Sequence, residues 1–273
     1  MPEIPDLIIF PLGLAAASVI AGLIAGLLGV GGGIVLVPVL YWMLPWLGAD
    51  DAVRMHVAVG TSLATIIATG FVSARSHAKR GNIAWDVIKE WWLPVMAGTI
   101  VGALVAARLK GDLLTGIFAV LALAVAIRLA FFGKAGETAA HTPPRPVYWL
   151  AAGVTGFVSS LMGIGGGTLS VPALVAFNHP MRRAVGTAAA LGLVIALPGT
   201  ITFIAEGWDQ PGLPPYSAGY VNFLAVAIII PVTMTMAPIG AHLAHAANPL
   251  WLRRIFALFL GATAIRMAIN VLT

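Results

Sequence analysis

The sequence predicts an all-α polytopic membrane protein built from two inverted-topology repeats of about five helical segments each. Three observations lead to this fold class: a shortage of charge, long uncharged stretches, and an internal duplication. Of the 273 residues, 60% are hydrophobic and 9% are charged, whereas about a quarter of the residues in a soluble domain are charged. So few charges cannot cover a water-facing surface, which excludes a soluble enzyme.

Three long stretches of the chain carry no Asp, Glu, Lys or Arg. They contain 43, 36 and 43 residues and span positions 7–49, 146–181 and 210–252. A helix of about 20 residues crosses the ~30 Å hydrocarbon core once. Lipid permits only helices and closed barrels, and a barrel needs alternating segments of ~10 residues, which these unbroken runs are not.

The chain repeats itself after 134 residues. Positions 22–38 match positions 156–172 at eight of 17 residues, and both contain a Gly-x-Gly-Gly-Gly run followed by Val-Pro. The Ala-Val-Gly-Thr sequence at 58–61 returns at 184–187. We therefore expect a first repeat at 1–132, a cytoplasmic linker at 133–146 and a second repeat at 147–273.

Glycine runs and charged loops divide each half into five segments. In the first half, the glycine run separates the first two segments, a basic loop ends the third, and a short charged loop separates the last two. These segments are expected at 7–29, 33–47, 55–74, 87–108 and 113–132. In the second half, where a glycine run again separates the first two segments, the segments are expected at 147–163, 167–178, 184–204, 220–245 and 251–271.

The loop charges predict how the segments face the membrane. If the basic loop with Arg75, Lys79 and Arg80 is cytoplasmic, nine Lys and Arg residues fall on that side and three on the other, together with seven of the ten acidic residues. This asymmetry follows the positive-inside rule, with Arg108 and Lys110 as exceptions. We expect an inner-membrane protein with both termini on the outer side.

Equivalent loops of the two halves carry opposite charge. The loop after the third segment is basic in the first half and acidic in the second, where it contains Glu206 and Asp209. These loops are therefore expected on opposite sides of the membrane, as in the inverted repeats of secondary transporters. This topology requires the first two segments of each half to return to the side from which they entered.

The two glycine runs, at 29–33 and 163–167, are expected to form turns inside the membrane. The helix expected at 167–178 rises only ~18 Å, so the hairpin either crosses fully or re-enters. Helix packing needs a small residue every fourth position, whereas three consecutive glycines would destabilise a helix by about 1 kcal/mol each. Non-helical backbone at this depth survives only when it is buried in protein or lines a polar cavity.

An anion site is the chemistry that such turns permit. Helices beginning at Gly33 and Gly167 would direct their unpaired N–H groups and positive dipole ends to the protein centre. Hydroxyl groups nearby would add donors without a charge. Arg128 and Arg266, equivalent in the last helix of each half, would balance an anion or instead extend to the interface. The expected substrate-binding residues are Gly31, Gly32, Gly33, Gly165, Gly166, Gly167, Thr61, Ser62, Thr168, Thr187, Arg128 and Arg266.

At these motifs the sequence resembles the sulfite exporter TauE/SafE family of membrane permeases. The resemblance rests on Gly-Val-Gly-Gly-Gly-Ile-Val-Leu-Val-Pro at 29–38, its partner at 163–172, His-Val-Ala-Val-Gly-Thr-Ser at 56–62 and Ala-Pro-Ile-Gly-Ala at 237–241. It implies a permease of the cytoplasmic membrane for small sulfur-containing anions such as sulfite or organosulfonates.

The predicted function is therefore secondary transport of a small anion by alternating access. An ATP-binding motif is absent from the sequence, so an ion gradient (H+ or Na+) or the substrate's own gradient must drive it. An anion channel is the nearest alternative and an intramembrane enzyme a remoter one, since the sequence has no Cys, no H-E-x-x-H and no G-x-S-x-G motif. We expect no cofactor, no metal, no catalytic residue and no nucleic-acid partner. The sequence leaves the oligomeric state open.

Overall fold

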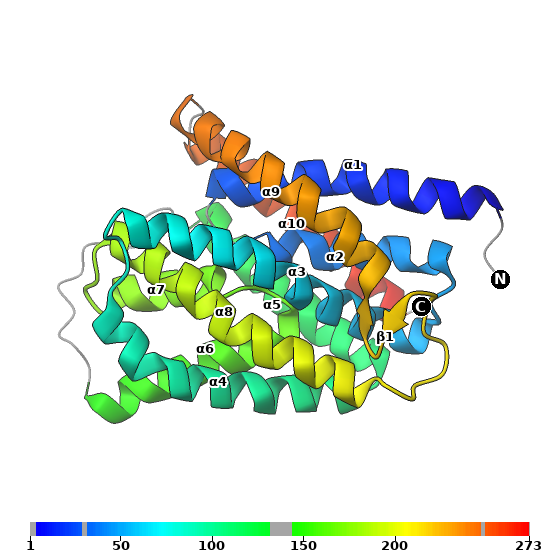
Figure 1. Cartoon of the computed structure of the whole chain (residues 1–273), viewed down its shortest axis with the longest axis horizontal. Helices are drawn as coiled ribbons and strands as arrows, with labels where there is room; N and C mark the ends of the chain where they lie inside the picture. Colours follow the sequence, from blue (N-terminus) through cyan, green and yellow to red (C-terminus); the bar gives the residue numbers. More distant parts are fainter. Residues whose placement is uncertain (1–3, 29–31, 132–143, 247–248, 273) are drawn as a thin grey trace.

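The computed structural model of the chain is built almost entirely of helices (Figure 1). It describes residues 4–28, 32–131, 144–246 and 249–272, without the side chains of 4–9, 24–28, 241–246 and 249–253. The elements in chain order are α1 (Ile4–Leu28), α2 (Gly33–Met43), the 3-10 helix η1 (Leu44–Leu47), α3 (Asp51–Lys79), α4 (Trp85–Arg108), α5 (Gly111–Phe131), α6 (Arg145–Met162), α7 (Gly167–Ala176), α8 (Met181–Glu206), the strands β1 (Ser217–Ala218) and β2 (Val221–Asn222), α9 (Phe223–Ala246) and α10 (Pro249–Leu272).

The all-α polytopic membrane class is confirmed. Six of the described helices, α3, α4, α5, α8, α9 and α10, contain segments long and apolar enough to cross a membrane. The ten segments expected from the sequence coincide with α1 to α10, and their ends differ by a few residues. One feature was not expected: β1 and β2 pair as a short antiparallel hairpin, so α9 begins at Phe223.

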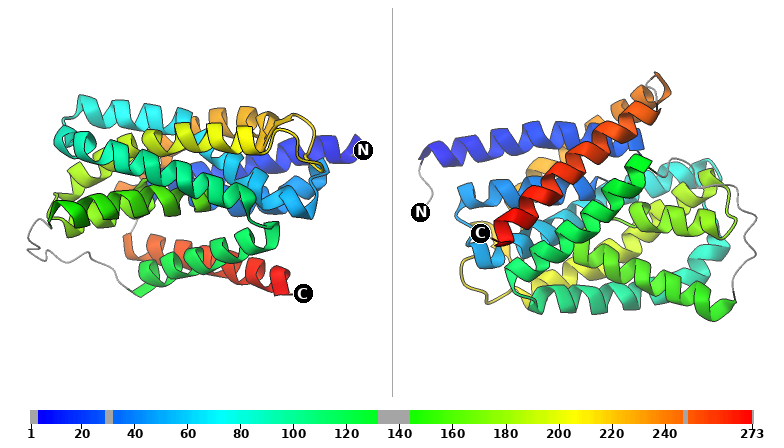
Figure 2. Two further views of the ribbon diagram at one scale, coloured as in Figure 1. Left: turned by 90° about the horizontal axis from the view of Figure 1, so that it is seen from below. Right: turned by 180° about the vertical axis from the view of Figure 1, so that it is seen from behind.

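Four helices of the first half each pack against a helix of the second half, and these pairs are related by the sequence repeat. The helix α1 packs on α9, α4 on α6, α3 on α8 and α5 on α10. Figure 2 shows α5 and α10 side by side on one side of the molecule. The counterpart of α1 in the second half is α6, and the counterpart of α4 is α9. The α1–α9 pair and the α4–α6 pair are therefore equivalent. The interhelical contacts therefore repeat between the halves, while the boundaries of the repeats stay a prediction.

Equivalent glycines make equivalent contacts in two of these pairs. A Cβ atom placed on Gly102 of α4 would lie 2.5 Å from the carbonyl oxygen of Phe157 in α6, and one on Gly240 of α9 would meet the carbonyl oxygen of Leu23 in α1. In the sequence repeat, Gly102 corresponds to Gly240 and Phe157 to Leu23. Close backbone approach at small residues is how membrane helices pack.

The helices α3 and α8 run in opposite directions (Figure 1). At the start of α3, the Asp50 N–H donates to the Gly212 carbonyl oxygen (3.0 Å), just beyond the end of α8. At the other end, the Ala84 N–H, just beyond α3, donates to the Thr187 hydroxyl oxygen in the first turns of α8 (2.9 Å). This orientation is what inverted repeats require, although the inversion across a membrane stays a prediction.

Thr61 and Thr187 make the same hydrogen bond in opposite halves. The Thr61 hydroxyl oxygen accepts from the backbone N–H of Asn222, directly before α9 (2.9 Å), just as Thr187 accepts from Ala84 directly before α4. Both threonines are fully buried. Each half therefore fixes the start of a long helix of the other half.

Glycines beside these threonines allow the close approach. A Cβ atom on Gly60 would overlap the carbonyl oxygen of Tyr220, and one on Gly186 would overlap that of Asn82. Tyr220 lies two residues before the N–H that Thr61 accepts, and Asn82 lies two residues before the N–H that Thr187 accepts. The repeated Gly-Thr pair thus serves one structural purpose twice.

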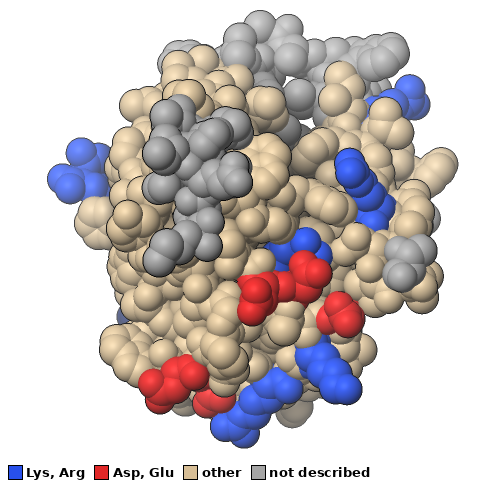
Figure 3. Space-filling view, turned by 90° about the vertical axis from the view of Figure 1, so that its right-hand side faces the viewer, with Lys and Arg blue, Asp and Glu red and all other residues tan. Residues whose placement is uncertain are grey.

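Charged side chains gather at the end of the molecule where α3 begins and α8 ends (Figure 3). Arg108, an exception to the charge asymmetry expected from the sequence, pairs there with Glu206 through two contacts of 3.2 and 3.3 Å. The positive charge of Arg108 therefore has a local counter-charge at the more acidic end.

Replacing either glycine of the Gly-Thr pairs should destabilise the protein. We expect Gly60→Ala and Gly186→Ala each to lose about 1–3 kcal/mol of stability, because the added methyl group overlaps a backbone carbonyl of the other half. Thermal unfolding in detergent micelles measures this as a lower melting temperature. Gly116→Ala is the matched control, since nothing lies within 4 Å of its Cβ position. Equal melting temperatures for all three variants would contradict the proposed packing role.

Candidate functional site

The two glycine-rich turns expected from the sequence are in direct contact. A Cβ atom placed on Gly33, the first residue of α2, would lie 2.7 Å from the carbonyl oxygen of Gly163 and 3.1 Å from the Cα of Ile164. Both of these residues belong to the turn between α6 and α7. The turns therefore meet through their backbones, at a place where a side chain would not fit. Gly31, also expected in the site, lies outside the described residues.

Left-handed backbone explains two of the glycines. Gly32, directly before α2, has φ 72°, and Gly163, directly after α6, has φ 63°. Most L-residues disfavour this region, whereas glycine adopts it freely. Gly166, directly before α7, has an ordinary φ of −53°, so the two helix starts differ in how strictly they require glycine.

Both short helices begin at this contact. Their first regular hydrogen bonds run from the Leu36 N–H to the Gly32 carbonyl oxygen (3.1 Å) and from the Ser170 N–H to the Gly166 carbonyl oxygen (2.7 Å). The first N–H groups of a helix have no i−4 carbonyl partner, and they form its positive end. Two positive helix ends therefore lie close together in the protein interior.

Hydroxyl groups surround the start of α7. The Ser170 side chain is fully buried, and its Oγ lies 3.1 Å from the Cβ position of Gly166. Neither Ser170 Oγ nor Thr168 Oγ1 has a hydrogen-bond partner, although both atoms are buried. Buried polar atoms are nearly always paired, so these two hydroxyls are donors that could bind an acceptor placed at the start of α7.

Ser62 holds the second turn in place. Its hydroxyl, fully buried on α3, donates to the Gly163 carbonyl oxygen at 2.7 Å. This hydrogen bond satisfies a carbonyl that the left-handed turn removes from the α6 ladder. Ser62 therefore positions the turn, and its proton is committed to that carbonyl.

The site is asymmetric between the halves. Thr168 and Ser170 of α7 correspond to Ile34 and Leu36 of α2, which carry no hydroxyl. The counterpart of Ser62 on α8 is Ala188, so the Ser62 hydroxyl also has no equivalent in the other half. The hydroxyls of Thr168 and Ser170 therefore have no counterpart at the first turn, which contributes backbone and packing.

Two residues that sequence reasoning missed enclose the turns. Ile66 of α3 lies 3.0 Å from the Cβ position of Gly33 and 3.3 Å from that of Gly165. On the opposite side, the backbone nitrogen of Gly192 in α8 lies 3.3 Å from the Cβ position of Gly166. Ile66 and Gly192 are equivalent positions, because each lies five residues after the threonine of a repeated Gly-Thr pair. This equivalence is the feature of the sequence that could have identified them.

The remaining expected site residues lie apart from the turns. Thr61 and Thr187 accept hydrogen bonds at the starts of α9 and α4, as described above. The Arg266 guanidinium carbon lies 4.5 Å from the ring centroid of Trp42, which is nine residues, or about 13 Å of helix, beyond Gly33. Arg128 is exposed on α5. In this structure the two arginines are therefore not part of the contact between the turns.

The interior of the described part of the chain contains no fully buried Asp, Glu, Lys or Arg. Nor do its residues include three or more His, Cys, Asp or Glu grouped as metal ligands. The donors available at the turns are backbone N–H groups and neutral hydroxyls. Such a set suits a small anion, because helix N-termini bind anions without a cationic side chain.

Known proteins are similar to this chain over most of its length. The family model described as "Sulfite exporter TauE/SafE" matches residues 14–267. A probable membrane transporter protein of Haemophilus influenzae is 35% identical, with 91% of this chain and 94% of the relative covered. One of Methanocaldococcus jannaschii is 28% identical over 97% of each chain, and one of Bacillus subtilis is 26% identical over 84% of this chain and 86% of its own. No solved structure matches.

Removing the Ser62 hydroxyl should loosen the second turn. We expect Ser62→Ala to lose about 1–3 kcal/mol of stability, because the buried Gly163 carbonyl would lack its donor. The melting temperature in detergent reports the change. Thr235→Ala serves as control, since that exposed hydroxyl bonds only to carbonyls of its own helix. If Ser62→Ala has the same melting temperature as the wild type, the hydrogen bond does not hold the turn.

Proposed function

The chain belongs to the sulfite exporter TauE/SafE family, and from this premise we propose that it is a secondary transporter of a small anion, with sulfite and small organosulfonates as the substrates. The anion binds where the two glycine turns meet. The names of the family and of the relatives indicate a membrane transporter rather than an enzyme.

One observation carries the proposal: two buried hydroxyls without a hydrogen-bond partner, those of Thr168 and Ser170, lie in the first turn of α7. Sulfite and the sulfonate group each present three oxygen atoms as hydrogen-bond acceptors. The first N–H groups of α7, together with the hydroxyls of Thr168 and Ser170, supply donors from one side of such a group. The positive ends of α2 and α7 add a favourable field.

Alternating access follows from how the halves are joined. Inverted repeats exchange the exposure of a central site by moving one part against another. Two observations support inverted repeats: the equivalent helix pairs α1–α9 and α4–α6, and the opposite directions of α3 and α8. In the proposed orientation, the inner membrane holds the basic end in the cytoplasm and both termini outside, and an ion gradient or the substrate gradient supplies the energy.

Removing the hydroxyl donors should weaken anion binding without unfolding the protein. We expect Ser170→Ala and Thr168→Val each to reduce sulfite uptake about tenfold or more at limiting substrate, since a hydrogen bond to a charged group contributes about 1.5–3 kcal/mol. Uptake and counterflow in proteoliposomes provide the measurement.

Controls for this experiment come from elsewhere in the chain. Thr115→Val removes a buried hydroxyl that bonds within α5 and should leave uptake unchanged. Bulky replacements at Gly32 or Gly166 should abolish uptake. Unchanged uptake in both hydroxyl variants would refute the site, and unitary currents without counterflow would identify a channel instead.

Topology can be tested by cysteine labelling, since the chain has no native cysteine. Lys79→Cys lies at the end of α3, and Asp209→Cys lies in the equivalent loop after α8. In intact cells whose outer membrane is permeable, an impermeant maleimide should label Asp209→Cys and should reach Lys79→Cys only after the inner membrane is opened. Labelling of both sites from the same side would exclude inverted repeats.

A further inference from the structure

A shallow groove runs between α4 and α6, away from the glycine turns. It has a volume of about 460 Å³ and is lined by Lys89, Glu90, Trp92, Leu93, Pro94, Ala97, Arg145 and Trp149. All of these side chains except Pro94 are exposed. Both helices begin at the same end of the groove, at Trp85 and Arg145.

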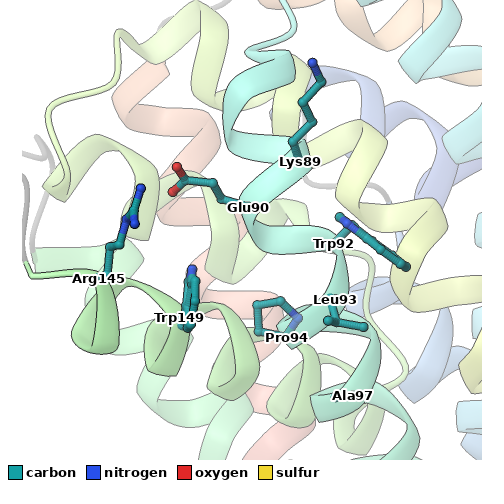
Figure 4. A pocket seen from close by; sticks show the side chains of 8 residues that line it. All are labelled: Lys89, Glu90, Trp92, Leu93, Pro94, Ala97, Arg145 and Trp149. Carbon is teal, nitrogen blue, oxygen red and sulfur yellow. The ribbon is translucent and has the colours of Figure 1, made fainter.

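Charged and apolar residues separate along the groove (Figure 4). Lys89, Glu90 and Arg145 lie toward one end, and the Glu90 carboxylate points from α4 toward the side of Arg145. Leu93, Pro94 and Ala97 lie toward the other end. The groove therefore offers a polar end that faces the helix starts and an apolar end that leads into the membrane-spanning part of α4.

Glu90 presents two kinds of acceptor at the polar end. Its carboxylate has no cation within 4 Å, since the ion pairs among the described residues are Arg54–Asp51 and Arg108–Glu206. Its backbone carbonyl is four residues before Pro94, which has no N–H to donate to it. A group with several N–H donors and a positive charge would satisfy both acceptors.

The groove lies at the depth of a membrane interface. Trp85, Trp92 and Trp149 near the starts of the two helices are 58%, 45% and 51% exposed, as expected of an aromatic belt. Beyond them, α4 and α6 approach closely where a Cβ on Gly98 would overlap the Gly153 carbonyl oxygen. This contact closes the groove between the backbones, and the outer surface beyond it is apolar.

We propose that this groove binds a phospholipid whose headgroup carries both a phosphate and a primary ammonium, as phosphatidylethanolamine does. Arg145 attracts the phosphate and can donate two parallel N–H bonds to it. The ammonium donates to the Glu90 carboxylate and to the carbonyl freed by Pro94. An acyl chain follows Leu93, Ala97 and the exposed apolar residues beyond them.

Charge complementarity selects this lipid among the common headgroups. A purely anionic headgroup would place negative charge beside Glu90 with nothing to pair its carboxylate. A choline headgroup carries positive charge without an N–H, so it cannot donate to Glu90. A headgroup with both a phosphate and an ammonium can pair with both Arg145 and Glu90.

Native mass spectrometry of the full chain in detergent tests the proposal. Phosphatidylethanolamine, phosphatidylglycerol and phosphatidylcholine with identical acyl chains are added at equal concentration to wild type and to Glu90→Gln. We expect wild type to bind phosphatidylethanolamine best. Glu90→Gln should weaken that binding about threefold or more, through loss of a charge-assisted hydrogen bond, and should bind phosphatidylglycerol more tightly than wild type does.

Two further variants make the result specific. Arg145→Gln should weaken binding of all three lipids, since each carries a phosphate, whereas Asp86→Asn, which removes an exposed acid from the same end of α4 outside the groove, should change nothing. The proposal is overturned if wild type prefers phosphatidylglycerol or phosphatidylcholine, if Asp86→Asn and Glu90→Gln behave alike, or if a second copy of the chain occupies this face and excludes the lipid.

Discussion

Backbone that leaves its helix inside a membrane must find partners within the protein, and this constraint governs the fold if the two glycine turns lie at the proposed depth. A carbonyl or N–H that faced lipid there would cost several kcal/mol. The Gly163 carbonyl oxygen accepts a hydrogen bond from the Ser62 hydroxyl, and Gly33 packs directly against this carbonyl. The turns are possible at the proposed depth because α3 and α8 enclose them and because glycine lets the backbones touch.

Enclosing the turns requires α3 and α8 to be held in register, and the paired Gly-Thr motifs provide that register. Thr61 fixes the start of α9, and Thr187 fixes the start of α4. Each bond links one half of the chain to the other. A conformational change that exposed the proposed site would have to carry these pairs along as rigid units or exchange their partners, which limits the movements open to the protein.

Much of the fold was predictable because hydropathy and glycine runs act locally. The ten segments, including the short α2 and α7, follow from residues close together in sequence. The partners of Thr61, Arg108 and Arg266 did not follow, because a contact between helices depends on how each helix is rotated and displaced along its axis. Equivalence between repeats suggested two matching arginines, but only the fold could place Arg266 on the ring of Trp42.

A site without buried charge has a consequence for a carrier that must also move when empty. A lysine or arginine at the centre would bind an anion strongly in a low dielectric, yet after release it would remain as an uncompensated buried charge, which is strongly destabilising. Backbone N–H groups and the hydroxyls of Thr168 and Ser170 carry no net charge. The proposed site therefore favours an anion through helix dipoles, and the empty state needs no counter-ion.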